Sequence, residues 1–128
     1  MANSDQSEAF CPYYRHAVEL VGRRWSGTII RALAGGVHRF SDIVDTIPGL
    51  SDRMLSERLK ELETEGIVVR TVYPETPVRI EYHLTEKGRA LGGVMDALSD
   101  WAHRWLAPSA EETGHLSEDP HREKQRSC

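Results

Sequence analysis

The chain has 128 residues, of which 39% are hydrophobic and 28% are charged, and its formal net charge is −4. This length suits one domain with its own core, and no apolar run approaches the roughly 20 residues that span a bilayer. The negative charge lies at the chain ends, because residues 13–106 hold 13 acidic and 13 basic side chains. A neutral middle segment still permits a local basic patch, so the net charge does not exclude a nucleic-acid partner.

The composition divides the chain into three parts. Residues 1–10 are polar, without the basic and apolar regions of a signal peptide, and are expected to be flexible. Residues 11–108 carry the periodic apolar pattern of one folded domain, and residues 109–128 form a polar tail that is expected to be disordered. Two cysteines, Cys11 and Cys128, do not make a disulfide framework. We therefore expect a cytoplasmic protein, associated with the nucleoid if it binds DNA.

Two helices are predicted at the start of the domain. The first covers residues 13–21, and Pro12 precedes it at a position where proline is favoured. Cys11 would then occupy the capping position, where the helix dipole favours a thiolate. The second helix covers residues 25–33, with Ser26 as a candidate cap.

A short helix, a turn and a longer helix follow. The short helix covers residues 39–47, with Ser41 as its predicted N-cap, and Pro48-Gly49-Leu50 forms the turn. The longer helix runs from an N-cap at Ser51 to a stop at Gly66. This order is typical of a helix-turn-helix, whose second helix enters the DNA major groove.

The longer helix has two different faces. Its apolar stripe has the spacing i, i+4, i+7 and consists of Leu55, Leu59 and Leu62. The opposite face is polar and consists of Arg53, Glu57, Lys60 and Thr64. The sequence thus predicts a helix that is anchored on one side and offers hydrogen-bonding groups on the other.

After Gly66 the apolar periodicity changes from helical to alternating. Residues 67–73 and 78–84 are predicted strands, joined by a turn that contains Pro74 and Pro77. Residues 85–106 form a last helix, which Thr85 caps. The fold class is therefore mainly α with a small β-hairpin, a winged helix-turn-helix.

Several side chains are candidates for DNA contact. Arg53 is the strongest candidate, because an arginine side chain can donate hydrogen bonds to both acceptors on the guanine edge. Glu57, four residues later, either forms an ion pair with Arg53 or accepts a hydrogen bond from a cytosine amine. Ser56 and Lys60 are expected at phosphates or base edges. Three residues at helix starts are expected near phosphates: Arg39, Ser41 and Ser51.

Arg79, beside the turn of the wing, has two alternatives. It enters a minor groove, where narrow A·T tracts attract arginine, or it pairs with Glu81 or Glu75 across the hairpin. The sequence does not choose between them.

The apolar stripe of the last helix is longer than one small domain covers. We expect this helix to pair two copies of the chain, and the family resemblance given below implies that the first helix takes part. The predicted interface consists of Tyr14, Val18, Leu91, Met95, Leu98, Trp101 and Trp105.

Catalysis and metal binding have no support in the sequence. The six histidines show no ligand spacing, and no Cys-x-x-Cys motif is present. There is no nucleophile–histidine–acid order and no phosphate-binding glycine loop. We expect no enzyme, no metal and no cofactor.

The ordered motifs resemble the HxlR-type winged-helix regulators of bacteria, which are MarR-like DNA-binding proteins. The matching segments are Cys11-Pro12, Gly22 with Trp25, Arg39 to Ile43, Ile47 to Ser51, Met54 to Leu62, Gly66, Tyr73 to Tyr82, and Leu84 to Gly88. The resemblance implies a homodimeric transcription factor, paired through its first and last helices, with one wing per subunit. A two-fold dimer would place two recognition helices about 34 Å apart in successive major grooves, so its operator is expected to be nearly palindromic. A compact DNA-binding module without an activation segment favours repression over activation.

How such a regulator is controlled stays open. Cys11 either senses oxidants and electrophiles, as the resemblance implies, or is a packing residue. A small ligand in a cleft lined by Tyr14, Trp25 and Trp101 is the other route. A different class of function is also compatible with the neutral middle segment: a winged helix that binds another protein and not DNA.

Overall fold

The computed structural model of the chain describes residues 11–108, in which five helices and one two-stranded sheet follow each other. The elements are α2 (Pro12–Gly22), α3 (Ser26–Ala34), α4 (Phe40–Thr46), α5 (Asp52–Thr64), β1 (Val68–Tyr73), β2 (Arg79–Leu84) and α6 (Glu86–Trp105). The predicted flexible ends, 1–10 and 109–128, lie outside the described residues. Among these helices none has the length and apolarity needed to cross a membrane.

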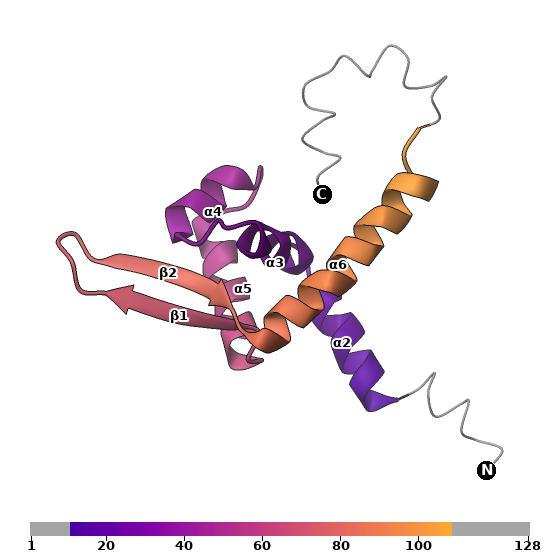
Figure 1. Ribbon diagram of the computed structural model, residues 1–128, viewed down its shortest axis with the longest axis horizontal. Coiled ribbons are helices and arrows are strands. Elements are labelled where there is room, and N and C mark those ends of the chain that lie inside the picture. Colours follow the sequence, from indigo (N-terminus) through magenta and orange to yellow (C-terminus); the bar gives the residue numbers. More distant parts are fainter. Residues whose placement is uncertain (1–10, 109–128) are drawn as a thin grey trace.

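The hairpin and the terminal helices lie on opposite sides of a small helical core. Figure 1 shows β1 and β2 extending to one side of α3, α4 and α5, whereas α2 and α6 occupy the other side. The core is apolar and includes Ile29, Ile30, Leu33, Ile43, Leu55, Leu59 and Leu62. The predicted leucine stripe of α5 is confirmed, since none of its three side chains is more than 1% exposed.

Local hydrogen bonds explain where α5 begins and ends. The Ser51 hydroxyl accepts a hydrogen bond from the Met54 backbone amide at 3.1 Å, as an N-cap does. Gly49 in the preceding turn and Gly66 after the helix have φ values of +85° and +76°. Glycine adopts this region without the steric penalty of a side chain, so the turn and the helix stop predicted from the sequence are both confirmed.

The wing is an antiparallel hairpin whose register pairs Val68 with Leu84 and Tyr73 with Arg79. A short extended segment before α4 joins it through an isolated bridge between Arg39 and Glu81. The Tyr82 amide also donates to the His38 carbonyl at 2.9 Å. The wing is therefore tied directly to the start of the helix-turn-helix.

Two helix starts differ from the prediction. Ser41 was expected to cap the short helix, but Arg39 is the N-cap, with extended backbone, and Ser41 lies inside the first turn. The bridge between Arg39 and Glu81 holds the chain extended up to this point, so the helix begins directly after it. Ser26 was a candidate cap and is instead a buried first helical residue, while Trp25 is the N-cap with a left-handed φ of 78°.

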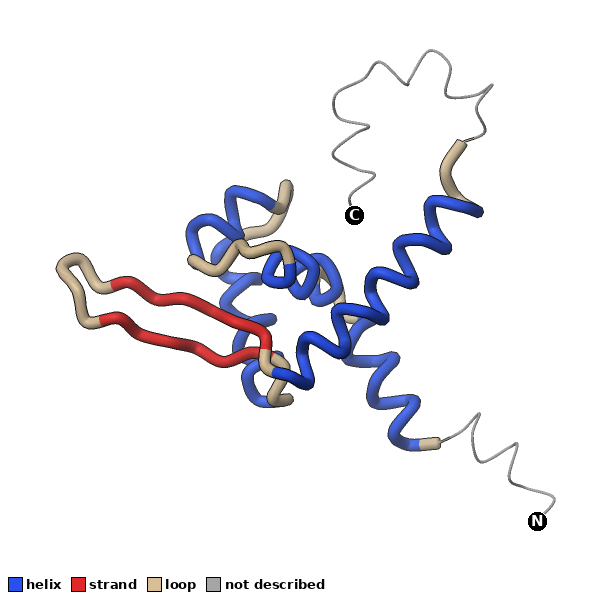
Figure 2. Tube along the Cα trace, in the orientation of Figure 1, coloured by secondary structure: helices blue, strands red, loops and turns tan. Residues whose placement is uncertain are grey.

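The last helix, α6, begins as predicted and is 20 residues long. The Thr85 hydroxyl accepts a hydrogen bond from the Gly88 amide at 3.1 Å. Figure 2 shows that the C-terminal part of this helix projects beyond the other elements. Met95 is 5% exposed and belongs to the core of the subunit, so it does not lie on the outer apolar face where the sequence prediction put it.

Candidate nucleic-acid interface

The outer face of α5 carries the side chains that the sequence singles out for DNA contact. The Arg53 side chain is 90% exposed, and Ser56, Glu57 and Lys60 are also exposed. The buried leucines on the opposite side fix the rotation of the helix about its axis. Burial of one stripe therefore presents all four polar side chains together on the surface.

Arg53 and Glu57 form an ion pair across one helical turn. The Arg53 Nε atom lies 3.5 Å from a Glu57 carboxylate oxygen, which is the i+4 arrangement that the sequence favoured. An ion pair this exposed contributes little free energy, so the guanidinium can exchange the carboxylate for a guanine edge. Lys60 has no ion-pair partner among residues 11–108.

The three residues predicted at helix starts lie in different settings. Ser51 caps α5, and its hydroxyl proton remains able to donate. Ser41 is exposed in the first turn of α4, and Arg39 is exposed at the N-cap of the same helix. Ser41 and Arg39 line a groove between the start of α4 and the turn of the wing, which Arg79 also lines.

Arg79 is held inside the wing by three neighbours. Its guanidinium lies 3.1 Å from Glu75 and 3.3 Å from Glu81 and stacks over the Tyr73 ring at 4.1 Å. Its Nε atom is buried without a hydrogen-bond partner among the described residues. The structure thus shows the ion-paired alternative for Arg79, in a chain without DNA.

The base of the wing contains a polar cluster that the sequence analysis did not identify. The His38 and His83 rings stack with their centroids 3.9 Å apart, and His83 Nε2 lies 2.9 Å from Glu81. The hydrogen bond with His83 holds the pKa of the Glu81 carboxyl below its usual value, and the positive charge of Arg79 adds to this effect. The i, i+2 spacing from Arg79 to His83 places these side chains on one strand face and was the available signal.

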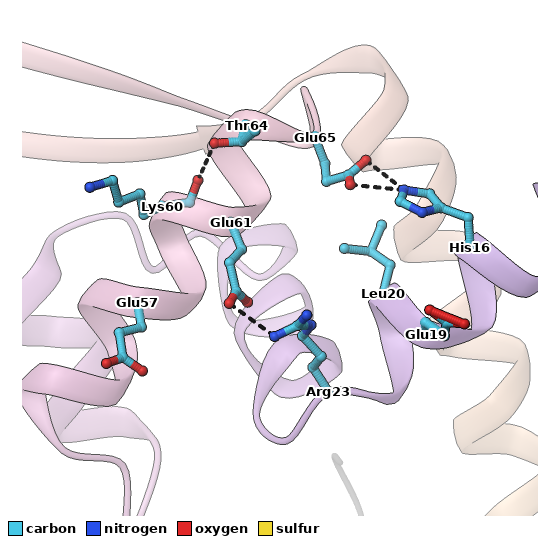
Figure 3. Close-up of a pocket in the computed structure, with 9 residues that line it drawn as sticks. All are labelled: His16, Glu19, Leu20, Arg23, Glu57, Lys60, Glu61, Thr64 and Glu65. Atoms are coloured by element: carbon cyan, nitrogen blue, oxygen red, sulfur yellow. Dashed lines mark hydrogen bonds and ion pairs between the residues drawn. The ribbon is translucent and has the colours of Figure 1, made fainter.

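A groove of about 410 Å³ lies between α2 and α5. Figure 3 shows its two walls, with His16 reaching the Glu65 carboxylate and Arg23 reaching Glu61. His16 Nε2 lies 2.8 Å and 2.9 Å from the two Glu65 carboxylate oxygens. This hydrogen bond keeps the pKa of Glu65 below its usual value.

The surfaces of α2 and α6 expose large apolar side chains. Among the predicted interface residues, the exposed fractions are 62% for Tyr14, 47% for Val18, 56% for Leu98, 53% for Trp101 and 64% for Trp105. Leu91 is partly buried against the core, and Met95 is inside it. Several exposed large apolar side chains on these two helices are typical of a contact with another protein surface.

Cys11 lies at the N-cap of α2, directly before Pro12, as predicted. Its thiol is partly exposed, makes no capping hydrogen bond and has no disulfide partner among the described residues. The position therefore combines solvent access with the positive end of a helix dipole. Neither the groove between α2 and α5 nor the groove beside the wing is lined by Tyr14, Trp25 or Trp101, the residues of the predicted apolar cleft.

A short helix, a tight turn, a longer helix with a polar outer face and a β-hairpin define a winged helix-turn-helix protein. The sequence of residues 20–110 matches the family model described as HxlR-like helix-turn-helix. The chain belongs to this family, whose members regulate transcription by binding DNA and are not enzymes. The sequence prediction of the family is confirmed.

Curated relatives carry the same description. The chain is 52% identical over 105 residues to the uncharacterized HTH-type transcriptional regulator YvaP of Bacillus subtilis, covering 82% of this chain and 96% of YvaP. It is 50% identical over 98 residues to the HTH-type transcriptional regulator YodB of the same organism, covering 77% of this chain and 88% of YodB.

Solved structures agree with the fold. The reduced form of YodB has a TM-score of 0.69 at 49% identity, over 77% of this chain and 97% of that one. YodB has also been solved after diamide treatment and with a quinone bound, each with a TM-score of 0.65 and with identities of 50% and 45%. The redox regulator HypR in its oxidized form has a TM-score of 0.68 at 34% identity, over 73% of this chain and 96% of HypR.

Proposed function

We propose that this DNA-binding regulator works as a homodimeric repressor on a near-palindromic operator. The observation that carries the proposal is the outer face of α5, where Arg53, Ser56 and Lys60 are exposed above a buried leucine stripe. A two-fold dimer would place two such faces in successive major grooves. The exposed apolar face of α2 and α6 supports pairing of two copies. Since its partner is chromosomal DNA, the cytoplasm is its proposed location.

Each DNA contact follows from exposure and chemistry. Arg53 reads a guanine, because it is almost fully exposed and its one ion pair among residues 11–108 is weak. Lys60 and Ser56 contact phosphates or base edges, while Arg39, Ser41 and Ser51 contact phosphates. Glu57 orients Arg53. Arg79 shapes the wing through its ion pairs and reaches the minor groove only if DNA displaces both Glu75 and Glu81.

Regulation through Cys11 is part of the proposal. Its thiol is accessible at a helix start, on a helix with an exposed apolar face. Relatives that have been solved in diamide-treated, quinone-bound and oxidized forms support an oxidant or electrophile as the effector. Modification of the thiol would change how α2 packs and hence how the two recognition helices are spaced.

A fluorescence anisotropy titration tests the proposal. The full chain would be titrated with DNA from its own genomic neighbourhood at two salt concentrations, with and without diamide. We expect selective binding that weakens steeply with salt, because phosphate contacts release counterions, and that is lost with diamide. Absence of selective binding at low salt would contradict the DNA-binding function and favour a winged helix that docks on another protein.

A further inference from the structure

Core packing fixes α2 only at its C-terminal end, where the partly buried Leu20 and Val21 contact the core. No residue of α2 is buried. The groove between α2 and α5 is polar, and Leu20 is the single apolar side chain among the described residues that line it. Toward α5, α2 and the residue after it make polar contacts, from His16 to Glu65 and from Arg23 to Glu61 (Figure 3), so polar contacts contribute to the angle between the two helices.

Arg58 does not line the groove itself but joins α5 to the segment that follows α2. Its side chain is 13% exposed, and its Nε donates a hydrogen bond to the Arg24 backbone carbonyl at 2.8 Å. One of its terminal nitrogens lies 3.2 Å from Glu61, whose carboxylate also pairs with Arg23 at 3.1 Å. Arg58 thus links the recognition helix to both residues that follow α2.

The backbone that Arg58 holds is a turn of unusual conformation. The Ser26 amide donates to the Arg23 carbonyl at 3.1 Å, and Trp25 has φ 78° and ψ −17°. These are the values of the third residue of a type II turn, a position that normally needs glycine. Type I and type II turns differ in the direction of their central carbonyl, which here is the Arg24 carbonyl. The hydrogen bond from Arg58 therefore favours the type II form.

The Trp25 ring completes the link. A Cβ atom placed on Gly49 would lie 3.4 Å from this ring, so the indole packs against the turn between α4 and α5. A change in the turn after α2 would move the ring away from Gly49 and withdraw the Arg24 carbonyl from Arg58. The contact of Trp25 with Gly49 and the hydrogen bond from Arg58 to Arg24 therefore couple the direction in which the chain leaves α2 to the position of the helix-turn-helix.

We propose that Arg58 is a positioning residue that sets the angle between α2 and α5, and through it the spacing of the two recognition helices in the dimer. It acts through the Arg24 carbonyl and Glu61 and does not touch DNA. This inference rests on the proposed dimeric DNA-binding function, because only in a dimer does the angle at α2 become a distance between half-sites.

DNA binding gives the first test, with Arg58→Met as the variant and Lys60→Met as the matched control on the same helix. The probe is the sequence that the unmodified chain selects from random DNA, offered as a full site and as a single half-site. We expect Arg58→Met to lose about tenfold or more on the full site, since bivalent binding fails when geometry forbids it, and to bind the half-site unchanged. Lys60→Met should weaken binding to both. Equal loss on both probes by Arg58→Met would overturn the inference.

A second measurement does not depend on DNA or on dimerisation. Spin labels on cysteines introduced at Arg15 and Glu63, in a Cys11→Ser, Cys128→Ser background, report the distance between α2 and α5. Dilution with unlabelled chain restricts the distances to one subunit. We expect Arg58→Met to broaden or shift this distance, and Glu61→Gln, on a half-exposed residue, to do so more weakly. An unchanged distance would overturn the inference even if DNA binding is confirmed, whereas failure of the unmodified chain to bind DNA would contradict the proposed function alone.

Discussion

Gly88 at the start of α6 lies so close to the Ile67 carbonyl oxygen that a methyl group at this position would overlap it. The same oxygen accepts hydrogen bonds from the Thr85 amide at 3.0 Å and from the Thr85 hydroxyl at 3.2 Å. The first turn of α6 is therefore packed directly on the first residues of the wing. Glycine is required here by close approach and not by its backbone angles.

Gly88→Ala should destabilise the fold by about 1–3 kcal/mol, because a well-packed site does not accept an extra methyl group. Gly93→Ala is the matched control, since nothing lies within 4 Å of a Cβ at that position. Gly93 lies within α6, so alanine there should stabilise by about 0.5–1 kcal/mol. Urea unfolding at one protein concentration measures the change in unfolding free energy of both variants. A neutral Gly88→Ala would show that the contact is looser than described.

Arg53→Ala should cost about 1–3 kcal/mol of DNA binding and relax specificity at one position of each half-site. Lys60→Ala should instead weaken binding to all sequences and reduce the slope of affinity against salt, because it removes a phosphate contact. Anisotropy titrations on the selected site and on its single-base variants distinguish the two effects. Identical losses of affinity and specificity in both variants would contradict the assignment.

We expect Trp101→Glu to disrupt the proposed dimer and leave monomers at micromolar concentration. Its ring is 53% exposed in the single subunit, and a dimer would bury the new charge without a partner. Val69→Glu is the control, since Val69 is 47% exposed and lies on β1, outside the two helices proposed to form the interface. Sedimentation velocity measures the oligomeric state of both variants. A Trp101→Glu protein that stays dimeric would place the interface elsewhere.

Cys11→Ser should leave DNA affinity unchanged in reducing buffer and abolish the response to diamide. The reason is that the thiol makes no capping hydrogen bond, so serine keeps the local structure. Cys128→Ser is the control and should respond as the unmodified chain does. If Cys11→Ser still releases DNA with diamide, the sensor lies elsewhere.

The ion pairs of Glu81 predict a pH dependence of stability. The pKa of Glu81 is lower in the folded chain than its ordinary value of 4.5, so its charged form stabilises the fold. This contribution is complete above pH 4.5 and is lost as the pH falls through the lower folded value. The difference in unfolding free energy between the unmodified chain and Glu81→Gln should therefore be largest near neutral pH and shrink in acid. A difference that is constant with pH would exclude this ionisation as its source.

Much of the candidate interface was predictable, because it depends on periodicity along one helix. Leu55 and Leu59 had to face a core, so Arg53 and Lys60 had to face outward. The i+4 spacing of Arg53 and Glu57 likewise indicated their ion pair before any fold was known. These relations are local, and the helix geometry alone converts spacing into direction.

Periodicity does not say which neighbour a side chain meets. Met95 and Leu98 share one stripe of α6, yet Met95 is in the core and Leu98 is 56% exposed, because α3 covers only part of that stripe. Ser41 lost its predicted capping role since a bridge to a strand 40 residues later holds Arg39 extended. The contact of Arg58 with Arg24 also joins separate segments.

The sequence by itself determined the order of the helices and strands, the buried and exposed faces of α5, and the family. Those properties follow from spacing, caps and turn residues within short stretches of chain. Only the tertiary structure decided the caps of α3 and α4, the division of α6 into core and outer face, and the link from α2 to the recognition helix. Each of these depends on contacts between residues far apart in the chain, where folding and not spacing brings the groups together.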